Sequence, residues 1–90
     1  MNQSLRDSIA AAIREAESAA KKPNSYGFLP GIIKTLKVML NDDTDTMSQK
    51  DRDRRVGGLG KLITDDFTFS ESPLGTKLLE VANRFLSNEK

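Results

Sequence analysis

Hydrophobic residues recur every three or four positions in four stretches of this chain, which is the spacing of one face of a helix. The first stretch, residues 4–22, carries an alanine-rich apolar stripe and ends at Pro23. The second, residues 31–41, is shorter, and Val38 falls outside its stripe. Because an apolar residue off the stripe widens the buried face, we expect this helix to be buried on two sides.

The third stretch, residues 48–66, begins with a clear helix start. Ser48 is a good N-cap, and Asp51 three residues later resembles the second half of a capping box. The first half of the stretch is charged and its middle is rich in glycine. Its apolar stripe is confined to the second half and consists of Val56, Leu59, Leu62 and Ile63.

The fourth stretch, residues 73–88, has the broadest apolar face in the chain. Ser72 is placed to cap it, and Pro73 occupies the first helical position, where its missing N–H is not needed. A helix with so wide an apolar stripe packs against several neighbours. We therefore expect residues 73–88 to be the central helix of the domain.

Two of the connections are too apolar to be simple linkers. Residues 23–30 contain Tyr26, Phe28 and Leu29. We expect them to fold back over the core, and the alternative is that Tyr26 and Phe28 form an exposed contact for a partner. Residues 67–71 alternate apolar and polar positions over too short a length for a strand, so we expect an extended connector that buries both of its phenylalanines.

Four helical stretches joined by connections of about five to eight residues predict an all-α fold. The fold is either a small four-helix bundle or an orthogonal cluster of helices, and the pattern does not decide between them. The length of 90 residues fits one domain, residues 1–90, with a single modest core.

Composition narrows the classes of function. The sequence has no cysteine and no histidine, which removes thiol nucleophiles, the commonest general base and the commonest transition-metal ligand. We therefore expect a protein that is not an enzyme and that uses neither a cofactor nor a metal. The formal net charge of +1 gives no long-range attraction for nucleic acid or an anionic membrane. No apolar run approaches the ~20 residues that span a bilayer, and the N-terminus lacks a secretion signal, so we expect a small soluble cytoplasmic protein.

Two ligand-binding motifs are suggested by the sequence, and both fail on their spacing. The acidic segment 41–47 resembles a calcium loop, but Thr46 occupies the position that requires glycine, and Arg52 occupies that of the bidentate glutamate. The string GGLGK resembles a phosphate-binding loop, but Arg55 takes the place of its first glycine, and Leu62 follows the lysine in place of serine or threonine. We therefore predict neither site.

The charged and glycine-rich third helix is the candidate binding surface. Gly57 and Gly58 lie roughly 100° and 200° from Val56 around a helix, away from its apolar stripe. Each costs roughly 1 kcal/mol relative to alanine, so either the helix breaks there or something outside the core comes close. The basic residues of this helix are interleaved with Asp51 and Asp53, which disfavour a phosphate partner. The candidate binding residues are Arg52, Arg54, Arg55, Gly57, Gly58 and Lys61.

The arginines at the start of this helix raise a separate question. Arg52 lies on the same side as the apolar stripe, and Arg55 lies beside it. Either the start of the helix projects past the core into solvent, or these arginines are partly buried against acids such as those of residues 42–45.

These observations favour a non-catalytic protein-binding module, that is, an adaptor, a regulator or inhibitor, or an immunity-type protein. An acidic protein surface is one partner that fits, because arginine favours bidentate contacts with carboxylates. The alternative is a nucleic-acid-binding domain that uses the basic residues of the same helix. A second alternative is a small enzyme that depends on carboxylates or lysine. The alanine stripe and the glycines also suit pairing with a second copy as a homodimer.

Overall fold

Five α-helices follow one another in residues 1–88, the part of the chain that the computed structural model describes. The four long helices agree with the predicted stretches to within about two residues at each end, the margin within which helix ends are defined. The all-α prediction is therefore confirmed. The helices are α1 (Gln3–Ala20), α2 (Leu29–Asn41), α3 (Gln49–Thr64), α4 (Phe67–Ser70) and α5 (Pro73–Leu86).

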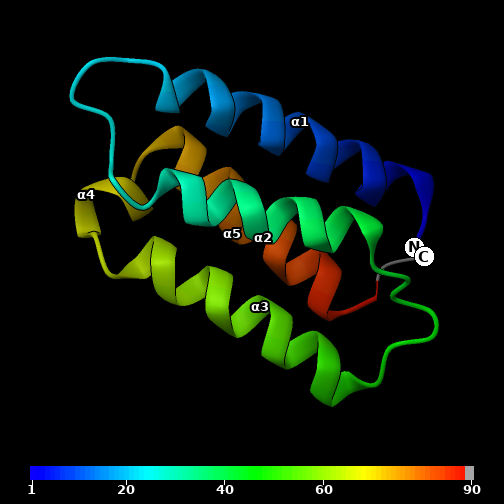
Figure 1. The fold of residues 1–90 in the computed structure, drawn as a ribbon. Coiled ribbons are helices and arrows are strands. Elements are labelled where there is room, and N and C mark those ends of the chain that lie inside the picture. The colour runs from blue at the N-terminus through cyan, green and yellow to red at the C-terminus, as the bar shows by residue number, and fades with distance from the viewer. Residues whose placement is uncertain (89–90) are drawn as a thin grey trace.

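The long helices form a small bundle in which successive members run in opposite directions (Figure 1). Helices α1 and α3 lie on opposite sides, with α2 and α5 between them (Figure 1). Helix α1 packs against α2 and α5, and α3 packs against the same two helices. The bundle is elongated, with extents of 39 × 22 × 18 Å, because all four long helices follow its long axis.

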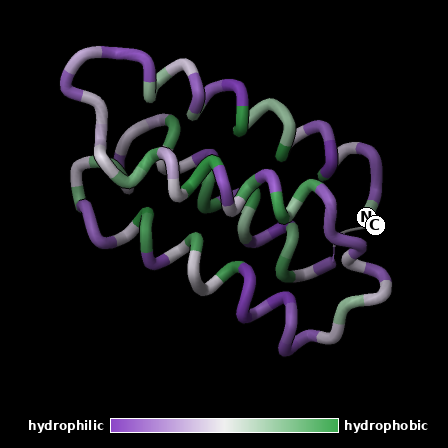
Figure 2. Tube along the Cα trace, in the orientation of Figure 1, coloured by the Kyte–Doolittle hydropathy of each residue, from purple (hydrophilic) through white to green (hydrophobic). Residues whose placement is uncertain are grey.

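One hydrophobic core lies where the apolar stripes of the helices meet. Figure 2 shows green, hydrophobic segments on the sides of the helices that face one another. Helix α5 packs against α1, α3 and α4, as its broad stripe predicts. The largest fully buried apolar side chains are Phe69, Phe85, Leu5, Ile9, Leu29, Ile32, Leu36, Met39, Leu59, Ile63 and Leu78.

Serine caps begin two of the helices at the predicted residues. The Ser48 hydroxyl accepts a hydrogen bond from the backbone N–H of Asp51 at 3.1 Å. The Ser72 hydroxyl accepts one from the backbone N–H of Gly75 at 3.0 Å. Each bond satisfies an N–H at the start of a helix that has no partner within the helix.

The predicted extended connector at residues 67–71 is wrong. Residues Phe67–Ser70 form the helical turn α4, and the side chain of Asp66 caps it by accepting from the N–H of Phe69 at 2.8 Å. Residues two apart share a face in a strand but lie on nearly opposite sides of a helix. The turn therefore buries Phe69, which is 2% exposed, and leaves Phe67 77% exposed.

The loop between α1 and α2 folds back over the core as expected. Tyr26 and Phe28 are half-buried and stack on each other with ring centroids 5.1 Å apart. Each ring also meets Phe69 edge-on at 5.1 Å, the spacing of a favourable aromatic pair. This three-ring cluster closes one end of the bundle, where the loop lies beside α4 (Figure 1).

The start of α5 lies so close to α4 that only glycine fits at Gly75. A Cβ atom added there would overlap the carbonyl oxygen of Phe69 and would lie 2.9 Å from its carbonyl carbon and 3.0 Å from Cα of Ser70. These are backbone atoms, which cannot move aside as a flexible side chain can. Gly75 therefore sets how closely the three-ring end of the bundle can pack.

The variant Gly75→Ala is expected to destabilise the protein by about 1–3 kcal/mol, because it overpacks a contact with backbone. The matched variant Gly58→Ala, which adds a methyl group in open space, is expected to raise stability by roughly 0.5–1 kcal/mol. Urea unfolding followed by circular dichroism measures both. An unchanged midpoint for Gly75→Ala would contradict the close packing of α4 on α5.

Candidate functional site

Arg52 connects the loop before α3 to the end of α5. Its Nη1 donates to the carbonyl oxygens of Thr44 and Met47 at 3.2 and 2.7 Å, in the loop before α3. Its Nε donates to the carbonyl oxygen of Leu86 at the end of α5, at 3.1 Å. Its Nη2 donates to Oε1 of Gln49 at 2.9 Å. These bonds occupy the guanidinium group, so the position of Arg52 suits a structural role better than contact with a partner.

Arg55 is also engaged within the molecule. Its Nε and Nη2 lie 2.8 and 3.4 Å from the two carboxylate oxygens of Asp42, the residue that follows α2. Of the two predicted arrangements, partial burial against the acids of residues 42–45 is therefore the correct one for Arg55. Arg52 is half-buried too, but it binds carbonyl oxygens instead of acids.

Gly57 and Gly58 lie within one continuous helix, since α3 runs without a break from Gln49 to Thr64. Both glycines are exposed, and a Cβ atom added at either would have nothing within 4 Å. Packing inside this chain therefore gives no reason for glycine at either position, although each costs roughly 1 kcal/mol relative to alanine.

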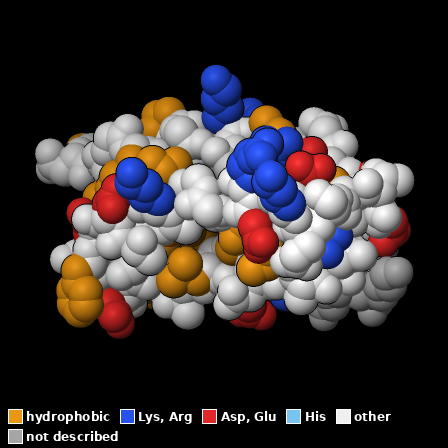
Figure 3. All heavy atoms as spheres, turned by 90° about the horizontal axis from the view of Figure 1, so that it is seen from below, with side chains coloured by type: hydrophobic (Ala, Val, Ile, Leu, Met, Phe, Trp, Pro, Cys, Tyr) orange, Lys and Arg blue, Asp and Glu red, His pale blue; other side chains and the backbone are white. Residues whose placement is uncertain are grey.

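The two glycines lie between two cations on the outer side of α3. Residues three and four apart are neighbours on a helix surface, so Gly57 and Gly58 each adjoin both Arg54 and Lys61. We call these four residues the glycine saddle. Figure 3, in which α3 faces the viewer, shows blue lysine and arginine side chains separated by uncharged surface. Four of the six candidate residues thus lie together, whereas Arg52 and Arg55 do not belong to this exposed group.

Two contacts fix how α2 and α3 lie against each other. A Cβ atom on Gly31 would touch Cδ1 of Leu62 at 3.6 Å, which places the start of α2 beside the end of α3. The pair of Asp42 and Arg55 places the end of α2 beside the start of α3. Because the helices are antiparallel (Figure 1), these contacts set which residues lie level with each other.

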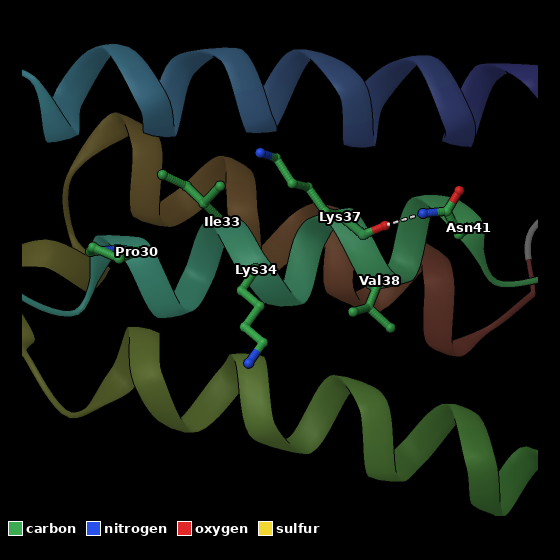
Figure 4. A pocket seen from close by; sticks show the side chains of 6 residues that line it. All are labelled: Pro30, Ile33, Lys34, Lys37, Val38 and Asn41. Atoms are coloured by element: carbon green, nitrogen blue, oxygen red, sulfur yellow. Dashed lines mark hydrogen bonds between the residues drawn. The ribbon is translucent and has the colours of Figure 1, made fainter.

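This register brings part of α2 to the edge of the saddle. Val38 lies about level with Gly58, and Lys34 about level with Lys61. Figure 4 shows the side chains of Val38 and Lys34 directed from α2 toward α3. Neither residue is among the binding residues predicted from the sequence, although the position of Val38 off the apolar stripe was a signal for one of them.

The predicted burial of α2 on two sides is wrong, since Val38 is 37% exposed. Helix α3 contacts α2 near Gly31 and again at Asp42, and Val38, which lies between these two contacts, remains exposed. Val38 also borders a hollow of about 520 Å³ on the outer face of α2 (Figure 4). This hollow is lined by Pro30, Ile33, Lys34, Lys37, Val38 and Asn41.

The cations around the saddle are unpaired. Within residues 1–88, Lys34, Arg54 and Lys61 have neither a carboxylate within ion-pair distance nor a side-chain hydrogen bond. By contrast, Lys37 lies 3.6 Å from Glu17, on the side of α2 that faces α1. Arg54 also lines a hollow together with Asp42 and Asp51. On the side of the glycines these cations border uncharged surface, an arrangement that can bind carboxylates or another anion.

The secondary candidates, Tyr26 and Phe28, lie elsewhere. Their rings pack on Phe69 at one end of the bundle, away from the saddle in the middle of α3. A hollow of about 270 Å³ borders Tyr26 but not Phe28. Packing against the core accounts for both rings without a partner.

Other kinds of site gain no support from the part of the chain described. Residues 1–88 contain no group of three or more acids placed to hold a metal ion. In the predicted acidic loop, Asp43 and Asp45 instead lie 3.6 and 3.2 Å from the N-terminal amine. None of the described helices is long and apolar enough to cross a membrane.

Comparison with known proteins gives no relative from which to infer a function. No protein-family model, curated protein or solved structure matches the chain. The residues and their geometry are therefore the only basis for a functional proposal.

The variant Arg52→Ala is expected to lower the free energy of unfolding by about 2 kcal/mol, because it leaves three partly buried carbonyl groups without their donor. Arg52→Lys is expected to recover only part of this loss, since one ammonium group cannot reach all three carbonyls. The matched variant Arg54→Ala, at an exposed position, is expected to change stability by less than about 0.5 kcal/mol. Thermal unfolding compares the three, and equal effects of Arg52→Ala and Arg54→Ala would contradict the structural role.

Proposed function

We propose that this chain is a non-catalytic protein-binding module that binds an acidic surface of another protein through the glycine saddle. It acts as an adaptor, a regulator or inhibitor, or an immunity-type protein. The observation that carries the proposal is the pair of bare glycines in the middle of an exposed, unbroken helix. A partner that comes close to the helix backbone explains why side chains are absent there.

The charges around the saddle support an acidic partner. Arg54, Lys61 and Lys34 lack an ion pair or side-chain hydrogen bond among the described residues. Arg54 and Lys61 flank the two uncharged glycines of the saddle. Arginine binds carboxylates in a two-point geometry, and association between surfaces of opposite charge is faster and more selective. Carboxylates on the partner would therefore meet donors that are already exposed.

Nucleic acid is the second candidate, because the same cations could contact phosphates. Asp51 and Asp53 on α3, and Asp65 just after it, are also exposed. A phosphate backbone is charged along its whole length and would be repelled by these acids, whereas a protein surface can carry carboxylates opposite the cations alone. We expect no binding to random duplex DNA at low salt. Measurable binding that falls steeply with salt concentration would favour the nucleic-acid function over the protein-binding one.

The remaining parts of the proposal rest on the sequence alone. The lack of histidine and cysteine supports a non-catalytic role, and a cytoplasmic location stays a prediction. Self-association as a homodimer also stays a prediction, which sedimentation analysis tests directly.

The double charge reversal Arg54→Glu and Lys61→Glu is expected to abolish capture of the specific partner from a native extract, because it places acids against acids. The matched control is Arg14→Glu with Lys21→Glu, which makes the same change in net charge at exposed positions, one in α1 and one at its C-cap. Capture is measured by comparative mass spectrometry, and direct binding of the purified partner by calorimetry.

Both double variants are first checked for folding by circular dichroism. A partner retained by the wild type and the α1 control but lost from the α3 variant supports the saddle. Partners that all bind the α3 variant as well as the wild type contradict it. If binding of a partner is lost equally from both double variants, it depends only on net charge, and this result contradicts a specific site.

A further inference from the structure

We infer that the segment of the partner that binds here is an acidic amphipathic helix, which crosses α3 through the glycine saddle and continues over Val38 of α2. This inference rests on the proposed function and specifies the class of its ligand. It follows from the width of the saddle, from the apolar floor that extends beyond it, and from the charges on its two sides.

The width of the saddle matches a helix. Arg54 and Lys61 are seven residues apart in α3, which at 1.5 Å per residue separates their Cα atoms by about 10.5 Å along the helix axis. A helix with its side chains is about 10 Å across. A partner helix can therefore lie between the two cations, on the surface that Gly57 and Gly58 leave open.

The floor of this path continues from α3 onto α2. Beyond Gly58 the register places Val38, which is 37% exposed, and the hollow on α2 extends the apolar surface to Ile33 and Pro30. Packed helices have axes about 8–10 Å apart, which corresponds to roughly two turns of a helix that crosses both. The partner helix thus needs a small residue over the glycines and an aliphatic residue about two turns away, over Val38.

The charged residues nearest to the path are cations, and the acids Asp51 and Asp65 lie one turn further out along α3. Lys61 and Lys34 lie about level with each other and form one side. Arg54 and Asn41 form the other side, since the same register places them about level. The Asn41 amide donates to the carbonyl oxygen of Lys37 (Figure 4). A helix with carboxylates on both flanks, and more of them on the flank beside Lys61 and Lys34, complements these charges.

The test is selection from a display library of helical peptides in which the underside and both flanks are randomised. We expect the enriched helices to carry acids on both flanks, with a small residue and an aliphatic residue about two turns apart underneath. Their dissociation constants are expected to rise by at least about tenfold for Gly58→Leu, which fills the saddle, and for Lys61→Glu. The Cβ atom that Gly58→Leu adds has nothing within 4 Å, and the position is exposed, so the variant is expected to fold.

The matched control is Ser18→Leu, which introduces the same side chain at an exposed position of α1, on the opposite side of the bundle. This variant is expected to leave affinity unchanged.

Enriched helices without acids, or binding that Gly58→Leu does not weaken, would overturn the inference. Selection that enriches no helix would overturn it as well. In these cases the capture experiment with Arg54→Glu and Lys61→Glu still decides whether the protein-binding proposal holds. A dimer in sedimentation analysis that Gly58→Leu dissociates would also overturn the inference, because the occupant would then be a second copy of this chain.

Discussion

The rotation of α3 about its own axis is the constraint on which the rest of this account depends. Leu59 and Ile63 hold the inner side of the helix in the core, where both are fully buried. At its first turns, Arg52 binds three carbonyl groups from the preceding loop and α5, and Arg55 pairs with Asp42. Because these contacts fix the inner side, they also determine which residues face outward. The exposure of the glycine saddle is therefore a consequence of how the helix start is anchored.

This anchoring divides the basic residues of α3 into two groups with different physical roles. The arginines nearest the core donate hydrogen bonds to polar groups of the protein itself. Replacing them would lower stability, because partly buried carbonyls and a carboxylate would lose their donors. The cations on the outer side form no such bonds with the described residues, so they remain able to bind a partner. The same contrast applies to glycine. Gly75 is required by the backbone of α4, whereas a Cβ atom added at Gly57 or Gly58 would meet nothing within 4 Å among the described residues outside the neighbouring backbone of α3. Surface residues whose identity is not explained by contacts inside the protein are candidates for a functional role.

Much of the fold could be predicted from the sequence, because helical periodicity and serine caps are local signals. The connector at residues 67–71 could not, since an apolar–polar alternation of this length also fits a helical turn, and the cap of Asp66 decides in favour of the turn. The site was predicted only in part. Which arginines are engaged depends on carbonyl groups as distant in sequence as that of Leu86, and the contribution of Val38 depends on the register between α2 and α3. Neither is encoded in the spacing of residues within one helix.

In the proposed function, a partner approaches the outer side of α3 at its glycines. The most direct measurement is the change in backbone amide chemical shifts of the isotope-labelled chain when its purified partner is added. We expect the largest changes in α3 between Arg54 and Lys61, and in α2 near Val38, with little change along α1. Changes concentrated on α1, or around the exposed Phe67 at the far end of the bundle, with none at Gly57 and Gly58, would contradict it.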